Sequence, residues 1–210
     1  MQVTNLFTRS MLDKNRDLQK ETPMKYDAAK PLTRGAKRTL TAFSGEMFKL
    51  LSAKAFEEIT VGELCEAAQY PRATFYNYFD DKYDLLNYCW QTLADRVGLY
   101  EYRHAEENEM LYLYFDRIYD FTKQSEGVIR SVLSHNGDGG YMFSSFRNFL
   151  NGKMRMIFRD CPQAGQKGVP TELLADHYSN TLFLVWQWIA VKSPACGKTQ
   201  AHEYLKLLIG

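Results

Sequence analysis

The segment from Arg72 to Asn77 brings together side chains that can read the edges of nucleic acid bases. An arginine can donate two parallel hydrogen bonds to guanine, an asparagine can pair with adenine, and the methyl groups of alanine and threonine can contact the methyl group of thymine. The segment offers each of these residue types: Arg72, Ala73, Thr74 and Asn77. Base reading requires these side chains to face outward from one element of the fold.

Four residues in and around this segment carry groups that suit phosphate oxygens: Thr60, Tyr76, Tyr78 and Lys82. Hydroxyl and ammonium groups bind phosphate, and a threonine that begins a helix presents free backbone N–H groups as well. Each residue taken alone has an ordinary structural role, as a helix cap, a packed ring or a solvated charge. The interpretation as a binding surface therefore depends on the elements that position these residues.

Two short helices are predicted here. Thr60 followed by Glu63 forms the T-x-x-E pattern of a capping box, which begins the first helix. Pro71 suits the first turn of the second helix, because the N–H that proline lacks would have no partner there. Phe75 and Phe79 lie on one side of the second helix and would pack against its neighbour, which leaves the base-reading side chains facing out.

Longer helices flank this pair. A helix that begins near Thr33 carries an apolar stripe at intervals of three and four residues. That stripe consists of Leu40, Phe43, Met47, Leu50 and Leu51. Asp80 is the predicted N-cap of another long helix, whose apolar positions are Tyr83, Leu86, Trp90, Leu93 and Val97. Two short helices joined by a brief turn between longer helices are typical of a helix-turn-helix DNA reader.

The same segment closely resembles the signature of the TetR family of transcriptional regulators. From Ile59 to Leu86 it reads ITVGELCEAAQYPRATFYNYFDDKYDLL. The family pattern includes Thr-Val, then Arg-x-Thr-hydrophobic-Tyr-x-His/Tyr-Phe, then a lysine and a pair of leucines. The matching positions are Arg72, Thr74, Phe75, Tyr76, Tyr78, Phe79, Lys82, Leu85 and Leu86. The resemblance extends from Leu40 to Trp90, and its DDKYDLL ending is similar to a subgroup common in Gram-positive bacteria.

The resemblance implies an all-α chain of about nine helices. It implies a three-helix helix-turn-helix DNA-binding domain at residues 33–80 and a helical effector-binding and dimerisation domain at residues 81–210. It further implies that double-stranded DNA is contacted by Thr60, Arg72, Ala73, Thr74, Tyr76, Asn77, Tyr78 and Lys82. Three residues depart from the family pattern. Gln69 stands where glycine is common, Tyr70 replaces a small aliphatic residue, and Pro71 replaces a Ser or Thr helix cap.

The periodicity of the second half predicts five further helices. Their ranges are Met110–Lys123, Glu126–His135, Tyr141–Arg159, Thr171–Val191 and Ala201–Ile209. The resemblance implies that this half binds a small molecule and dimerises through its last two helices. Predicted ligand-pocket residues are Tyr112, Phe115, Tyr119, Phe146 and Trp186, a lining that suits an unidentified apolar or aromatic effector. Predicted dimer contacts are Leu174, Tyr178, Thr181, Val185 and Trp188.

Charge is distributed unevenly, although the net charge is only +1. Residues 1–38 hold nine basic and four acidic side chains, whereas residues 39–94 hold four basic and eight acidic ones. Residues 1–32 are therefore interpreted as a basic N-terminal extension. Two interpretations of this basic region stay open. It either supplies attraction to DNA, through residues such as Lys30, Arg34, Lys37 and Arg38, or is a tail without such a role.

Cysteine and histidine spacing argues against a metal site or a disulfide framework. Cys65, Cys89, Cys161 and Cys196 form no CxxC pair, and the four histidines show no ligand spacing. We therefore expect reduced thiols, no metal and no cofactor. The N-terminus lacks the apolar core of a signal peptide, and the longest apolar run is too short to span a bilayer. A cytoplasmic location without a membrane partner is expected.

Three functions are compatible with this pattern. The favoured one is a sequence-specific DNA-binding transcriptional regulator, a repressor that binds a near-palindromic operator as a homodimer and is released or retuned by a small molecule. The second is a coactivator or adaptor of the same fold, whose weakened reader binds a partner protein. The departures at Gln69 and Pro71 and the acidic reader favour it. The third is an enzyme, which no catalytic spacing, phosphate-binding glycine loop or metal motif supports.

Overall fold

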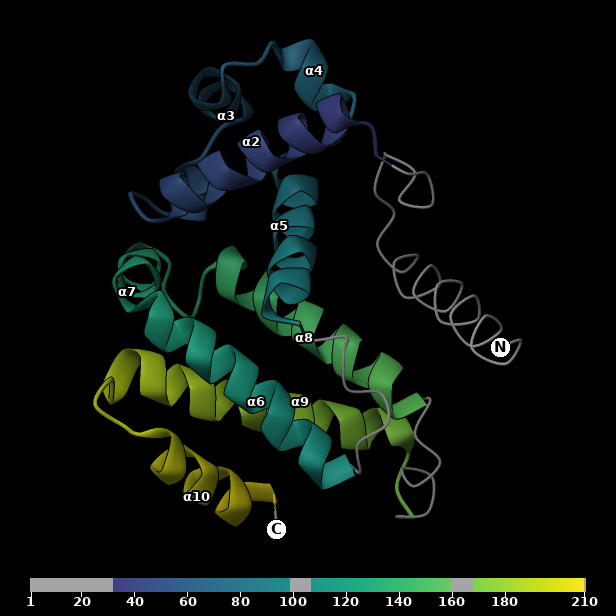
Figure 1. Cartoon of the computed structure of the whole chain (residues 1–210), viewed down its shortest axis with the longest axis vertical. Coiled ribbons are helices and arrows are strands. Elements are labelled where there is room, and N and C mark those ends of the chain that lie inside the picture. The colour runs from purple at the N-terminus through teal and green to yellow at the C-terminus, as the bar shows by residue number, and fades with distance from the viewer. Residues whose placement is uncertain (1–31, 99–106, 160–167, 210) are drawn as a thin grey trace, which may run out of the picture. The chain divides into compact units, whose positions relative to one another are not determined.

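A computed structural model describes residues 32–98, 107–159 and 168–209, which form nine α-helices and no β-strand (Figure 1). The all-α fold predicted from the sequence is confirmed. The N-terminal extension up to Pro31 lies outside the described residues, and so do His104 and Cys161. None of the described helices is both long enough and apolar enough to cross a membrane.

The described residues form two compact units. The first consists of residues 32–47 and Ile59–Tyr88, and the second consists of Phe48–Glu58 and residues 89–209. Two helices, α2 at Arg34–Leu51 and α5 at Lys82–Val97, therefore run from one unit into the other. The chain passes between the units three times.

The first unit contains two short helices, α3 at Val61–Ala68 and α4 at Arg72–Tyr76. The capping box predicted at the start of α3 is confirmed. The Thr60 hydroxyl accepts the Glu63 N–H at 3.2 Å, and the Glu63 carboxylate accepts the Thr60 N–H at 3.0 Å. This reciprocal pair satisfies backbone groups that a helix end otherwise leaves without partners, so it fixes where α3 begins.

The start of α5 differs from the prediction. Asp80 is not its cap. The carboxylate of Asp81 instead accepts the backbone N–H groups of Tyr83 and Asp84, both at 2.9 Å. The Asp80 N–H donates to the Asp84 carboxylate at 3.2 Å. Adjacent aspartates offer the same capping chemistry, so the path of the backbone decides which of them caps the helix.

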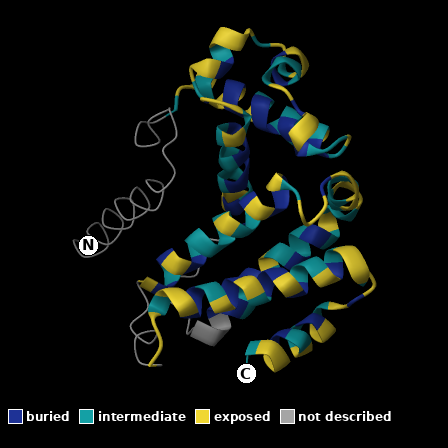
Figure 2. Ribbon diagram, turned by 180° about the vertical axis from the view of Figure 1, so that it is seen from behind, coloured by how far each residue is buried: buried dark blue, intermediate teal, exposed yellow. Residues whose placement is uncertain are grey.

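The second unit contains the remaining helices: α6 at Glu107–Gln124, α7 at Glu126–His135, α8 at Tyr141–Arg159, α9 at Thr171–Gln187 and α10 at Lys198–Ile209. The predicted bounds of α7 and α8 are confirmed, and α9 is followed by a π-helical turn at Trp188–Lys192. Helix α8 packs along α9, which also contacts α6 and α10 (Figure 1). Buried and exposed residues alternate along these helices, as expected when one face of each lies in a core (Figure 2).

Asn136, in the turn between α7 and α8, binds the chain segment that follows α2. Its Oδ1 accepts the Phe56 N–H at 2.8 Å, and its Nδ2 donates to the carbonyls of Leu51 and Val132 at 2.9 and 3.0 Å. The ring of Phe56 also stacks on Tyr141, with centroids 5.4 Å apart. Because Asn136 is buried, water does not compete for these bonds. The segment from Leu51 to Phe56 is thereby fixed to the α7–α8 turn.

Replacing Asn136 with alanine is expected to lower the free energy of unfolding by about 2–4 kcal/mol. The change removes hydrogen-bond partners from the buried Phe56 N–H and Leu51 carbonyl, and each group left unsatisfied costs about 1–3 kcal/mol. Denaturant unfolding followed by circular dichroism measures the difference. The control is Asn148→Ala, at an exposed position of α8, which should change stability by no more than about 0.5 kcal/mol. Equal stability of Asn136→Ala and the wild type would show that these hydrogen bonds do not stabilise the fold.

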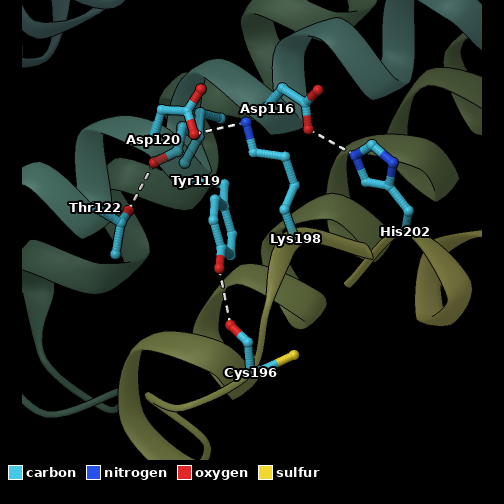
Figure 3. A network of polar contacts seen from close by, with 8 residues as sticks. Asp116, Tyr119, Asp120, Thr122, Cys196, Lys198 and His202 are labelled. Atoms are coloured by element: carbon cyan, nitrogen blue, oxygen red, sulfur yellow. Dashed lines mark hydrogen bonds and ion pairs between the residues drawn. The ribbon is translucent and has the colours of Figure 1, made fainter. Parts of the chain in front are cut away.

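Polar contacts attach α10 to α6 (Figure 3). Asp116 on α6 lies 2.6 Å from His202 Nε2, and Asp120, one turn along, lies 2.6 Å from Lys198 Nζ. The hydrogen bond to Asp120 raises the pKa of Lys198, because it stabilises the charged form of the lysine. Both contacts use one face of α10.

Candidate nucleic-acid interface

Aromatic packing holds α4 in place. Phe75 and Phe79 are fully buried, and both meet the ring of Phe43 on α2 edge-on, with centroid distances of 5.3 and 6.3 Å. The ring centroids of Phe75 and Phe79 lie 5.4 Å from each other. Tyr70, in the turn before α4, lies 5.6 Å from the same Phe43 ring. One side of the short helix is therefore committed to the core of the first unit.

The other side of α4 is open to solvent. Its exposed residues are Arg72, Ala73, Tyr76 and Asn77. Thr74 and Tyr78 are half-buried beside them. Six of the eight residues predicted to contact DNA therefore lie on this helix or directly after it. A recognition helix needs one face for packing and one for reading, and α4 has one buried and one exposed face.

The turn between α3 and α4 has a backbone conformation that favours glycine. Gln69 has φ 58° and ψ 39°, in the left-handed region, which costs a residue with a Cβ atom about 1–2 kcal/mol. The Gln69 N–H donates to the Glu66 carbonyl at 3.1 Å, and the Tyr70 N–H donates to the Cys65 carbonyl at 3.0 Å. The turn thus closes α3 with the usual hydrogen bonds of a left-handed helix end.

Replacing Gln69 with glycine is expected to raise the free energy of unfolding by about 0.5–1 kcal/mol. Glycine removes the left-handed strain, while its greater freedom in the unfolded chain offsets about 0.4–1 kcal/mol of that gain. Denaturant unfolding measures the change. The matched control is Gln69→Ala, which shortens the side chain but keeps the Cβ atom, and it should give no stabilisation. A glycine variant less stable than the wild type would show that the turn is not strained.

Gly62 leaves room for the Arg72 side chain against the first turn of α3. A Cβ atom at position 62 would lie 2.7 Å from Arg72 Nη2, closer than Cβ atoms pack in proteins. The same guanidinium acts on the Cys65 thiol. Burial raises the pKa of Cys65, and the positive charge of Arg72 lowers it to a smaller extent. The exposed Arg72 side chain therefore lies along α3.

Two of the predicted phosphate contacts already have partners within the chain. Lys82 Nζ donates to the Ile59 carbonyl at 2.8 Å, which connects the start of α5 to the start of α3. An ammonium group has three donors, so this bond is compatible with a phosphate contact. The Thr60 hydroxyl lies 3.0 Å from the Glu63 carboxylate. That negative charge weakens the attraction of this helix end for an anion.

The residues that form this interface match a known family. Residues 48–89, which span the end of α2, both short helices and the first half of α5, match the model of the bacterial regulatory proteins of the tetR family. Over these residues the chain carries the signature of the TetR family. The resemblance found in the sequence is thereby confirmed. No curated protein matches the chain by sequence.

A solved structure shows a similar arrangement of helices. It is the fatty acid degradation regulator FadR from Bacillus halodurans, with a TM-score of 0.57 and 16% sequence identity. The similarity covers 86% of this chain and 97% of that chain. Sequence identity at this level shows a shared fold. A helix-turn-helix domain followed by a helical C-terminal domain is confirmed.

The predicted ligand-pocket residues fall into two groups, of which the first lies on α6. Tyr112 and Phe115 contact the His202 ring at centroid distances of 5.1 and 6.1 Å. Tyr119 donates its hydroxyl to the Cys196 carbonyl at 2.8 Å (Figure 3). These three side chains join α6 to α10 and the turn before it. Among the described residues, no group of three or more His, Cys, Asp or Glu side chains is placed to hold a metal ion.

The second group lies between α8 and α9. Phe146 and Trp186 contact each other, with centroids 5.6 Å apart. The Trp186 Nε1 donates to the Thr122 hydroxyl on α6 at 2.8 Å. Phe143 and Phe183 complete an aromatic cluster with the first two rings. This aromatic cluster joins α8 to α9.

The residues predicted for dimer contacts are divided between core and surface. Leu174, Tyr178 and Val185 are buried in the core of the second unit, and Thr181 is half-buried. Trp188, in contrast, is 52% exposed. Side chains buried in the chain's own core leave little area for a second chain.

An exposed stripe follows the adjacent face of α9 and its π-helical turn. Its members recur at intervals of three and four residues: Leu173, His177, Asn180, Leu184, Trp188 and Val191. Leu207 and Leu208 are exposed on α10. Sequence reasoning missed this stripe because α9 is apolar on several faces, so its periodicity does not reveal which face lies inward.

Proposed function

We propose that this TetR-family chain is a sequence-specific DNA-binding transcriptional regulator. The observation that carries the proposal is the division of α4 into a side anchored by Phe75 and Phe79 and an exposed side led by Arg72. In this proposal Arg72 binds a guanine edge and Asn77 binds an adenine edge. The methyl groups of Ala73 and Thr74 contact the methyl group of thymine. Helix α4 would enter the major groove with its N-terminal end towards the bases.

Phosphate contacts would set the position of this helix on the duplex. The hydroxyls of Tyr76 and Tyr78, the Lys82 ammonium and the start of α3 at Thr60 supply them. The described residues of the first unit carry five basic and six acidic side chains, so that unit adds little long-range attraction. Three of those five basic side chains are exposed at the start of α2 and would concentrate the attraction there: Arg34, Lys37 and Arg38.

The regulator acts as a homodimer in this proposal. The exposed stripe of α9 supports it, because four large apolar side chains on one helix face are better covered by a second copy than by water. Those side chains are Leu173, Leu184, Trp188 and Val191. Two readers related by a two-fold axis would address half-sites about 34 Å apart on a near-palindromic operator.

A small molecule would retune this dimer, most simply by releasing a repressor from its operator. The aromatic residues of the second unit favour an apolar or aromatic effector. The similar regulator from Bacillus halodurans is named for fatty acid degradation, which makes lipophilic acids a natural first set to test. Helix α5, which is continuous from the first unit into the second, would transmit the change of population.

A coactivator or adaptor role is the second candidate. The acidic excess of the first unit and the Glu63 carboxylate beside Thr60 favour it, since both weaken attraction to phosphate. Such a protein would keep the TetR fold and bind a partner regulator through the same surface.

Selection of bound sequences from a random DNA pool by the full chain separates the two roles. The regulator should enrich a near-palindrome whose half-site centres are about 10 base pairs, or a multiple of that, apart. Mobility-shift titration of the enriched sequence should then give saturable binding that survives competitor DNA. A pool without enrichment would contradict the regulator and favour the adaptor.

A further inference from the structure

Three polar atoms between α8 and α9 are enclosed without a partner. Arg147 Nε, Asn151 Oδ1 and Ser179 Oγ make no hydrogen bond within the described part of the chain. We call these three residues the polar seam. Ser179 is only 1% exposed, so its hydroxyl is deep in the second unit. Buried polar groups in folded proteins are nearly always satisfied, and three exceptions in one place indicate a missing partner.

Contacts on either side show that the members of the polar seam lie close together. Arg155 donates two hydrogen bonds to the Asp176 carboxylate, at 2.7 and 2.6 Å. Arg147 Cζ lies 4.8 Å from the centre of the Phe183 ring. Helices α8 and α9 therefore run antiparallel. Asn151 and Ser179 face each other between these two contacts. The seam is one site rather than three separate defects.

The surroundings of the polar seam are apolar on one side. The aromatic cluster of Phe143, Phe146, Phe183 and Trp186 begins at the ring under Arg147, and its centroids lie 5.5–6.3 Å apart. A guanidinium stacked on a ring keeps its edge for hydrogen-bond acceptors. A positive, donor-rich end thus adjoins a hydrophobic region.

We propose that the polar seam binds the carboxylate of a hydrophobic monocarboxylic acid whose apolar part lies among the rings of the aromatic cluster. Arg147 Nε and the Ser179 hydroxyl donate to the carboxylate oxygens. A 180° rotation of the Asn151 amide, which leaves its shape unchanged, presents Nδ2 as a third donor. A single negative charge suffices, because the neighbouring Arg155 is already paired with Asp176. The inference deepens the proposed function, on whose effector site it rests.

Calorimetric titration of the full chain without DNA tests the proposal. The probes are dodecanoate and 4-phenylbutyrate, which carry an aliphatic and an aromatic tail on the same carboxylate. Their uncharged counterparts, dodecan-1-ol and 4-phenylbutan-1-ol, and acetate, which lacks a tail, are the controls. At least one acid should bind once per chain and at least tenfold more tightly than its alcohol, with no binding of acetate. Failure of both acids to bind overturns the proposal.

Variants of α8 and α7 locate the binding. Arg147→Met keeps the apolar stem, removes the guanidinium, and should weaken the acid at least tenfold while leaving the alcohol unchanged. Arg130→Met removes an exposed arginine from α7 and should leave acid binding as in the wild type. Equal affinity of the acid for Arg147→Met and the wild type would place the ligand elsewhere and overturn the assignment.

A stability measurement on Ser179→Ala separates a ligand site from a structural hydrogen bond. If the hydroxyl awaits a ligand, the ligand-free variant should have a Tm equal to the wild type or higher by about 2–4 °C, together with weaker acid binding. A fall in Tm would show that Ser179 has a partner inside the protein and would overturn the proposal. Acid binding without any operator binding would contradict the proposed function alone. Operator binding by the wild type, together with unchanged acid affinity in Arg147→Met, would contradict this inference alone.

Discussion

Replacing Arg72 with alanine is expected to abolish sequence-specific DNA binding while leaving the fold intact. A bidentate arginine–guanine contact contributes about 1–3 kcal/mol of discrimination, and a symmetric dimer loses it twice. Affinity for the selected operator should therefore fall on the order of a hundredfold or more. The fold should persist because Arg72 is exposed and the anchors of α4, Phe75 and Phe79, are untouched. Mobility-shift titration and thermal unfolding measure the two effects.

Two further variants sharpen the interpretation of this result. Arg130→Ala removes the same charge from an exposed position in the second unit, where the residue pairs with Glu126 one turn away, and operator affinity should not change. Arg72→Lys keeps the charge but not the fork-shaped donor pair, so it should retain non-specific binding and lose sequence preference. Normal affinity and preference in Arg72→Ala would remove α4 as the reading element.

Replacing Leu184 with glutamate is expected to convert a dimer into a monomer and to abolish operator binding with it. Leu184 is 55% exposed near the middle of the α9 stripe. Burial of a leucine contributes about 1.5–3 kcal/mol, and a glutamate in its place must lose water without gaining a partner. Two-fold symmetry applies this change twice and brings two negative charges near each other. Sedimentation velocity at micromolar concentration should show half the mass of the wild type.

The control for this variant is Val128→Glu. Val128, on α7, is 56% exposed, so the substitution changes an apolar surface residue of nearly equal exposure away from the stripe. It should leave both mass and operator binding unchanged. A wild-type chain that sediments as a monomer would contradict the homodimer, and a Leu184→Glu chain that stays dimeric would move the interface away from α9.

The features that sequence analysis predicted well depend on local signals. The capping box at Thr60 and Glu63 is complete within four residues, so no distant contact is needed to place it. The bounds of α7 and α8 follow from the glycine-rich break at residues 137–140 between two periodic segments. The TetR signature likewise lies within one short stretch, and the family match covers that same stretch.

The features that sequence analysis missed depend on how distant segments meet. Three of the residues chosen on α9 face the core, because a helix with apolar side chains on several faces does not reveal its orientation. Arg147, Asn151 and Ser179 are each ordinary in sequence. Only the antiparallel packing of α8 on α9 brings them together and removes them from water. The choice of Asp81 over Asp80 as a cap is a smaller case of the same limit.

The hydrogen bonds that Asn136 makes to residues 51–56 constrain how parts of this protein can be fused to parts of other regulators. Residues 48–58 lie early in the chain, yet their hydrogen-bond partners are on the α7–α8 turn. A fragment cut after residue 80 would take Phe56 and Leu51 away from those partners and leave their backbone groups exposed. A chimaera that grafts this reader onto a foreign sensor half therefore needs three junctions, with residues 48–58 inherited from the sensor parent. Reader exchange between such regulators is a transplant of two pieces of chain rather than of one.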